Sequence, residues 1–101
     1  MTRISFSDKR GRLRICAEGH ATGSEAACAA VSAIMYALAG WLLNENGEGA
    51  ELEKSELRAG YAEIIFSGGE AARTAYEMAV IGLMQIAQAE PKRVSIVREG
   101  A

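Results

Sequence analysis

Hydrophobic and polar residues alternate near the N-terminus, and this pattern predicts two β-strands. Ile4 and Phe6 alternate with serines, and in segment 12–18 the apolar Leu13, Ile15 and Ala17 are separated by Arg12, Arg14, Cys16 and Glu18. A period of two places every second side chain on the same face of a strand. Residues 8–11 supply the turn between the strands. The chain is therefore expected to open with a β-hairpin, followed by a glycine-containing loop over 19–24.

The spacing of apolar residues then changes to that of a helix. The residues that recur three or four positions apart are Val31, Ile34, Met35, Leu38 and Leu42. This spacing predicts a first helix from about Glu25 to Leu43. Thr22 and Glu25 have the spacing of a capping box, and Ser24 is an alternative N-cap.

The second half of the chain repeats the order of elements. Residues 44–49 form a polar loop, and 51–61 and 62–67 are predicted to be two strands that turn near Ala59-Gly60. Ser67-Gly68-Gly69 precedes a second helix, whose apolar stripe contains Ala72, Tyr76, Ala79, Val80, Leu83 and Ile86. Pro91 ends this helix, and Val94, Ile96 and Val97 indicate a last strand. The order ββαββαβ predicts an α/β (α+β) domain, with two alanine-rich helices packed on a mixed or antiparallel sheet.

Length and composition limit the architecture and the partners. A chain of 101 residues and 10.7 kDa forms a single domain, residues 1–101, because it is too short to fill two cores. The formal net charge of −2 gives no overall cationic field, so direct binding of nucleic acid is not expected. Two cysteines are too few for a disulfide-built secreted scaffold. With no signal-peptide pattern in the first residues, the expected location is the cytoplasm.

One segment has to be compared with a membrane span. Eighteen consecutive residues, Ala26 to Leu43, are uncharged, which is the lower limit of length for a span. Nine of them are Ala, Gly or Ser, and the flanking charges are Glu25 and Glu45 instead of Lys or Arg. We therefore expect a buried helix and no membrane partner.

The candidate chemistry lies where the first hairpin meets the first helix. His20, the single histidine, follows the second strand, and Cys28 lies in the first turns of the helix. A helix N-terminus and a nearby imidazolium both stabilise a thiolate, and free N–H groups at a helix start can stabilise an oxyanion. The two residues are thus the minimum set for a cysteine peptidase. From residue types alone, Cys28 as a small buried hydrophobe and His20 as a loop residue remain the alternative.

Three short motifs carry a family resemblance. Gly19-His20-Ala21, Gly23-Ser24-Glu25 and the run Cys28-Ala-Ala-Val-Ser-Ala-Ile34 resemble the ribosomal-processing cysteine protease family, Prp. Members of that family carry Gly-His-Ala, Gly-x-Asp and Cys-Ala-Ala-Val-Ser-Ala in this order. Here Glu25 replaces the aspartate, and the segment between His20 and Cys28 is several residues shorter.

The resemblance implies a fold, an activity and site residues. It implies a homodimeric α/β cysteine endopeptidase with Cys28 as nucleophile and His20 as base. The implied substrate is the N-terminal extension of a large-subunit ribosomal protein, the twenty-seventh of that series, cut beside an aromatic residue. No cofactor and no metal are implied. The supporting residues expected around the pair are Gly19, Gly23, Glu25 and Ser32.

Other interpretations of the same residues stay open at this point. A rival from another class is a non-catalytic homodimeric module that kept the fold and binds a peptide or a ribosomal protein. A zinc site of Cys16, Glu18, His20 and Cys28, or a disulfide between the two cysteines, is a weaker alternative. The basic cluster of Lys9, Arg10, Arg12 and Arg14 is interpreted as a solvated face, with contact to ribosomal RNA or an acidic peptide as the weaker alternative. Tyr36, Trp41 and Tyr76 are interpreted as core, with a dimer face or an apolar pocket for an aromatic substrate residue as the alternatives.

Overall fold

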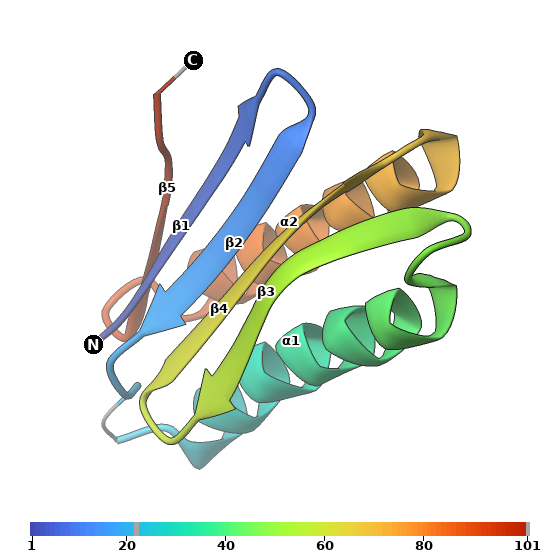
Figure 1. Cartoon of the computed structure of the whole chain (residues 1–101). Helices are drawn as coiled ribbons and strands as arrows, with labels where there is room; N and C mark the ends of the chain where they lie inside the picture. The colour runs from blue at the N-terminus through green and yellow to red at the C-terminus, as the bar shows by residue number, and fades with distance from the viewer. Residues whose placement is uncertain (22, 101) are drawn as a thin grey trace.

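The computed structural model describes residues 1–21 and 23–100 and contains the predicted order of elements. The elements are β1 (Thr2–Lys9), β2 (Arg12–Glu18), α1 (Glu25–Glu45), β3 (Ala50–Arg58), β4 (Tyr61–Gly68), α2 (Glu70–Ala89) and β5 (Val94–Arg98). The predicted ββαββαβ order is confirmed, as is the mixed sheet. Figure 1 shows both helices on the same side of the sheet, so the domain has two layers.

The sheet has five strands in the order β3-β4-β2-β1-β5. Three of its pairings are antiparallel, and β1 pairs with β5 in parallel. The parallel pair is possible because α2 carries the chain from β4 across to the β5 edge (Figure 1). The central strand is β2, which lies between β4 and β1.

Two-residue turns close both hairpins and explain where the predicted strand boundaries were wrong. Arg10 and Gly11 both have positive φ, 56° and 85°, which is the conformation of the turns that match the twist of a hairpin. The first turn is therefore shorter than the predicted 8–11. In the second hairpin β3 ends at Arg58 and Tyr61 already belongs to β4, because Ala59 and Gly60 alone form the turn.

The core lies between the sheet and one stripe of each helix. Its largest fully buried side chains are Phe66, Ile4, Leu13, Ile15, Met35, Leu42, Ile64, Leu83 and Val94. Tyr76 of α2 is buried and meets the Phe66 ring edge-on at 6.3 Å between centroids. Of the three aromatic residues considered for a dimer face, Tyr76 is therefore core, Trp41 is half-buried, and Tyr36 is exposed.

The expectation that α1 is a buried helix is correct for only one of its faces. The helix is long and apolar enough to cross a membrane by length and composition, but only 33% of its apolar window is buried in the domain. In a two-layer domain a helix buries only the stripe that faces the sheet. The outer face of α1 stays uncharged and open to solvent, with Tyr36 and Leu43 exposed.

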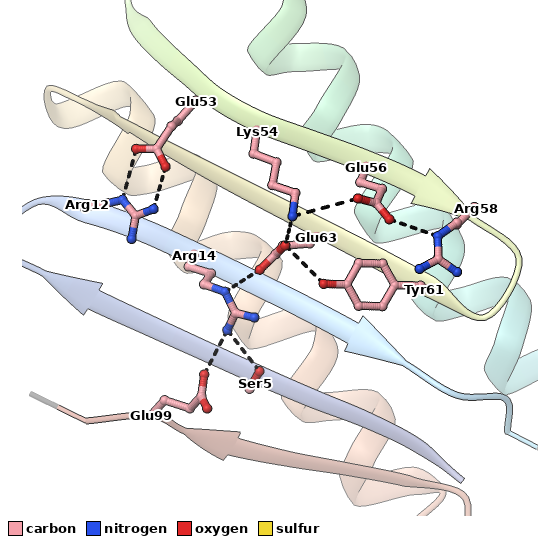
Figure 2. A network of polar contacts seen from close by, with 10 residues as sticks. All are labelled: Ser5, Arg12, Arg14, Glu53, Lys54, Glu56, Arg58, Tyr61, Glu63 and Glu99. Atoms are coloured by element: carbon pink, nitrogen blue, oxygen red, sulfur yellow. Dashed lines mark hydrogen bonds and ion pairs between the residues drawn. The ribbon is translucent and has the colours of Figure 1, made fainter.

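The opposite face of the sheet carries a network of charged side chains (Figure 2). Glu63 of β4 is at its centre and is buried. Its carboxylate accepts hydrogen bonds from Arg14 Nε at 2.6 Å, from Lys54 Nζ, and from Tyr61 Oη at 3.1 Å. These donors, Lys54 first, hold the pKa of the Glu63 carboxyl at about 2. Ion pairs of Arg12 with Glu53, of Arg14 with Glu99 and of Arg58 with Glu56 surround it.

The basic cluster and Cys16, both singled out in the sequence, lie on or near this charged face of the sheet. Lys9, Arg10 and Arg12 of the basic cluster are exposed, as expected for a solvated face, and Arg14 is half-buried. Arg12 pairs with Glu53 and Arg14 with Glu63. Cys16 lies beneath the network and is buried, and burial raises the pKa of its thiol. Cys16 is therefore a protonated thiol closed off from solvent.

Substitution of Glu63 by glutamine is expected to lower the free energy of unfolding at neutral pH by about 2 kcal/mol. The folded-state pKa lies below that of the unfolded chain, so the carboxylate stabilises the fold fully above pH 4.5. This contribution is lost as pH falls toward about 2. Urea unfolding of both proteins at pH 7 and pH 3 measures the difference, which should shrink at pH 3.

Glu53→Gln is the matched control. Glu53 also pairs with an arginine on the same face, but the Glu53 and Arg12 side chains are each 52% exposed. Exposed ion pairs contribute little to stability because solvent screens them, so this variant should be nearly as stable as the wild type. Equal stability of the two variants at pH 7 would show that the burial of Glu63 adds nothing.

Candidate active site

The predicted site residues gather at the end of the sheet where β2 stops and α1 begins. The loop between these two elements lies beside the β3–β4 turn (Figure 1). The N-terminal strand and the turn before β5 reach the same end of the domain. Four separate stretches of the chain therefore contribute to one place.

Gly19 fixes the point at which the chain leaves β2. Its φ is +90°, and a β-carbon at this position would lie 2.4 Å from the carbonyl oxygen of Met1. The Gly19 N–H donates to the Gly60 carbonyl at 2.8 Å, which joins the loop to the β3–β4 turn. Only glycine meets both conditions, because a side chain would have to displace backbone. The expected supporting role of Gly19 thus has a steric basis.

His20 rests on the β3–β4 turn. Gly60 has φ +77°, and a β-carbon there would lie 2.9 Å from His20 Nε2. The missing side chain of Gly60 is what leaves room for the imidazole. His20 is otherwise exposed, so a substrate can reach the ring.

Cys28 is held at the start of α1. Ser24 is the N-cap, with its side chain accepting from the Ala27 N–H at 3.1 Å and its carbonyl from the Cys28 N–H at 3.2 Å. The Ala21 N–H points at the sulfur, 3.2 Å from Cys28 Sγ. Ser24 is thus the N-cap of α1, and the alternative, Thr22, lies outside the described residues. The sulfur therefore lies beside a backbone donor, within the first turn of a helix.

The Ser24 cap reduces the number of backbone N–H groups at the helix start that are free to stabilise an oxyanion. The N–H groups of Ala27 and Cys28 are already used, one by the Ser24 hydroxyl and one by the Ser24 carbonyl. The expectation that the helix start as a whole offers free donors is therefore too broad. The amides that an α-helix leaves without an intrahelical partner here are those of Glu25 and Ala26.

Two cavities meet at the pair. One, of about 200 Å³, lies between α1 and the β3–β4 turn, and the other, of about 540 Å³, lies over the loop and the helix start. Both are lined by His20 and Cys28. Within the described residues no hydrogen bond joins the imidazole to the thiol, as is common for catalytic pairs without substrate. A peptide that occupied both cavities would pass directly over the sulfur.

The other predicted residues lie around these cavities. Ser32 follows Cys28 by one helical turn and lines the smaller cavity, and Glu25 is exposed and lines the larger one. Gly23 has φ +90° and also lines the larger cavity. All four supporting candidates, Gly19 included, therefore lie at the site.

The metal and disulfide alternatives gain no support. In the described part of the chain, no group of three or more His, Cys, Asp or Glu side chains could hold a metal ion. Cys16 and Cys28 are both free thiols. Cys16 lies on the open face of the sheet, whereas Cys28 lies on the helix layer.

Several residues at the site were not expected from the sequence. The Ala59-Gly60 turn was predicted, but nothing in the pattern tied it to His20. The same is true of the Ala21 amide at Cys28 Sγ, and of Arg58 and Tyr61, which line the smaller cavity. Tyr36 also lines that cavity, so of its interpretations the pocket lining agrees with the structure. Arg58 stacks over the Tyr61 ring, 4.7 Å from its centroid. Contacts of this kind depend on register and not on local pattern.

Comparison with known proteins agrees with this geometry. The model of a family described as cysteine protease Prp matches residues 1–95. No curated protein sequence matches the chain. Among solved structures, the ribosomal processing protease Prp from S. aureus with a covalently linked product peptide superposes with a TM-score of 0.79 and 15% identity, covering 98% of this chain and 100% of that one.

Two further structures share the fold. The same S. aureus protease with a substrate peptide gives a TM-score of 0.71 at 14% identity, covering 98% of this chain and 100% of that chain. The structure of SMU.848 from Streptococcus mutans gives 0.70 at 24% identity, covering 98% and 96%. At these identities the structures establish the common fold.

Proposed function

The chain belongs to the cysteine protease Prp family, and from this premise we propose that it removes an N-terminal extension from a large-subunit ribosomal protein with Cys28 as nucleophile and His20 as general base. The activity class, a cysteine protease, comes with the family. The substrate and the catalytic pair are our proposal. The observation that carries the pair is the placement of both side chains at the junction of the same two cavities.

The geometry supports a thiolate mechanism. His20 takes the proton of Cys28, and the Ala21 N–H and the start of α1 stabilise the sulfur anion. The thiolate attacks the scissile carbonyl, and the remaining first-turn amides of α1 stabilise the tetrahedral oxyanion. His20 then gives its proton to the leaving amine, which departs as the carbonyl re-forms as a thioester. Water, deprotonated by His20, hydrolyses the thioester and frees Cys28.

The form of the site supports a peptide substrate. Cys28 lines two separate cavities, which offer places for substrate residues before and after the scissile bond. Structural relatives from S. aureus hold a substrate peptide and a covalently linked product peptide. We further propose that the protein works in the cytoplasm, where ribosomal proteins are made, and that its partner is a peptide.

The direct test is processing of the host's own ribosomal protein. The purified protein is incubated with the extended twenty-seventh large-subunit protein, and the products are weighed by mass spectrometry. We expect one cut that leaves the mature N-terminus. An extended protein that stays intact, but binds, would favour the non-catalytic binding module instead.

We also propose that the protein acts as a homodimer through the outer face of its helices. Both helices carry exposed apolar side chains, which are Leu43 of α1 and Met78, Ile81 and Met84 of α2. Between α1 and α2 lies a groove of about 730 Å³, lined mainly by small and apolar residues that include Trp41. Self-association would bury this surface.

Sedimentation equilibrium tests the dimer. The wild type is expected at twice the chain mass of 10.7 kDa, and Met78→Glu with Ile81→Glu at the monomer mass. Lys9→Glu, at an exposed position on the β1–β2 hairpin away from both helices, serves as the control and should stay dimeric. A wild-type monomer at high concentration would contradict this part of the proposal.

A further inference from the structure

The loop between β2 and α1 contacts two charged side chains that are far away in the sequence, Glu90 and Arg93. Glu90 ends α2, and Arg93 lies in the turn before β5. Ser24 Oγ donates to Glu90 Oε1 at 3.4 Å, and Arg93 Nη1 donates to Glu90 Oε2 at 3.2 Å. One carboxylate therefore joins the N-cap of α1 to an arginine of the α2–β5 turn.

Arg93 makes its own contact with the loop. A β-carbon on Gly23 would lie 3.3 Å from Arg93 Nε and 3.4 Å from Nη2, so the guanidinium lies against the backbone of Gly23. Gly23, at φ +90°, makes the sharp bend that leads into Ser24. Together, Glu90 and Arg93 contact two consecutive residues at the start of α1.

The α2–β5 turn is itself firmly placed, so it can act as a support. Arg93 N–H and Val94 N–H both donate to the Glu90 carbonyl, at 3.0 and 2.9 Å. The Arg93 carbonyl accepts from the Thr2 N–H at 2.9 Å, which ties the turn to β1. The pair therefore connects the loop to the sheet.

The position of Cys28 depends on Ser24. The Ser24 hydroxyl that donates to Glu90 also accepts from Ala27 N–H, and the Ser24 carbonyl accepts from Cys28 N–H. A hydroxyl whose proton is held by Glu90 keeps its lone pair directed at Ala27. Loss of Glu90 would let the first turn of α1 shift and take Cys28 Sγ away from the Ala21 N–H.

From these contacts we propose that Glu90 and Arg93 are positioning residues for the reaction, which hold Gly23 and Ser24 so that Cys28 stays aligned with His20 and Ala21. This inference rests on the proposed function of Cys28 and His20. The Glu90 and Arg93 side chains are 33% and 39% exposed, and pairs so exposed to solvent contribute little to global stability. Their removal should therefore change catalysis more than folding.

The test compares steady-state cleavage of a peptide that spans the extension of the ribosomal protein. Glu90→Ala and Arg93→Ala are each expected to lower kcat on the order of tenfold, with KM within about twofold and the thermal midpoint close to that of the wild type. Lys92→Ala, at the exposed neighbouring position, is the matched control and should behave as wild type.

Conservative rescue and a double variant separate positioning from general damage. Glu90→Gln keeps an oxygen that accepts from Ser24 Oγ and should recover most of kcat. Ser24→Ala with Glu90→Ala should be no slower than Ser24→Ala alone, because both changes break one connection. Additive losses, or a Gln variant as slow as the Ala variant, would overturn the proposal.

A measurement without substrate keeps this inference separate from the proposed function. Amide hydrogen exchange of Cys28, whose N–H bonds to the Ser24 carbonyl, should be several-fold faster in Glu90→Ala than in Lys92→Ala. Unchanged exchange and unchanged kcat, in a protein that Cys28→Ala inactivates, would refute the positioning role alone. An active Cys28→Ala protein would refute the catalytic proposal. The amide hydrogen exchange of Cys28 would then still show whether Glu90 holds the first turn of α1 in place.

Discussion

Replacement of Cys28 by alanine is expected to lower the rate of processing by about four orders of magnitude or more. The substitution removes the only thiol that lines the cavities of the site, in the part of the chain that the structure describes. Nothing else there can form the thioester. The helix cap should survive, because Ser24 bonds to the backbone of residue 28 and not to its side chain. Cleavage of the extended ribosomal protein, followed by mass spectrometry over several hours, measures the loss.

The second cysteine supplies the control for this result. Cys16 is buried on the other face of the sheet, and burial raises the pKa of its thiol. Cys16→Ala should therefore process the substrate at nearly the wild-type rate. Persistent cleavage by Cys28→Ala, or loss of cleavage in a folded Cys16→Ala protein, would show that the assignment of Cys28 as the nucleophile is wrong.

Gly60→Ala is expected to reduce processing on the order of a hundredfold, although it substitutes neither Cys28 nor His20. A β-carbon there would lie 2.9 Å from His20 Nε2, so the imidazole has to leave its seat on the β3–β4 turn. The positive φ of Gly60, +77°, adds a backbone cost of about 1 to 2 kcal/mol. Both effects are measured on one sample, by cleavage rate and by urea unfolding.

Gly47→Ala separates the two effects. Gly47 has a similar φ of +89°, but a β-carbon there would have no neighbour within 4 Å. This variant should pay the same backbone cost and keep its activity. If both variants lost the same fraction of activity, strain and not the displacement of His20 would be the cause.

The fold could be predicted from the sequence because its main signals are local. Alternation at Leu13 and Ile15, and helical spacing at Val31 and Leu38, place the core residues of β2 and α1 correctly. The boundaries near Arg58 and Tyr61 were missed, since glutamate and lysine in β3 blur the strand pattern. The exposed face of α1 was missed as well, because an uncharged, alanine-rich outer face has the same composition as a core.

The site could be predicted in part. Cys28 and His20 were identified by short motifs and by the logic of a thiol at a helix start. The packing of His20 against Gly60 and the contact of Ser24 with Glu90 were not predicted, because each joins residues that are far apart in the chain. Such contacts follow from the pairing of β2 with β4 and from where α2 ends. No local pattern records them.

The central proposal is that Cys28 is the nucleophile of the reaction and that His20 activates it. Its most direct test is the rate of alkylation of each cysteine by iodoacetamide at pH 7, read by peptide mapping in the wild type and in His20→Ala. Alkylation is fast only where a thiol is reachable and activated by its surroundings. We predict that Cys28 reacts much faster than the buried Cys16, and that His20→Ala slows the reaction of Cys28 on the order of tenfold. A Cys28 thiol that reacts no faster than Cys16, or at a rate that His20→Ala leaves unchanged, would contradict the account.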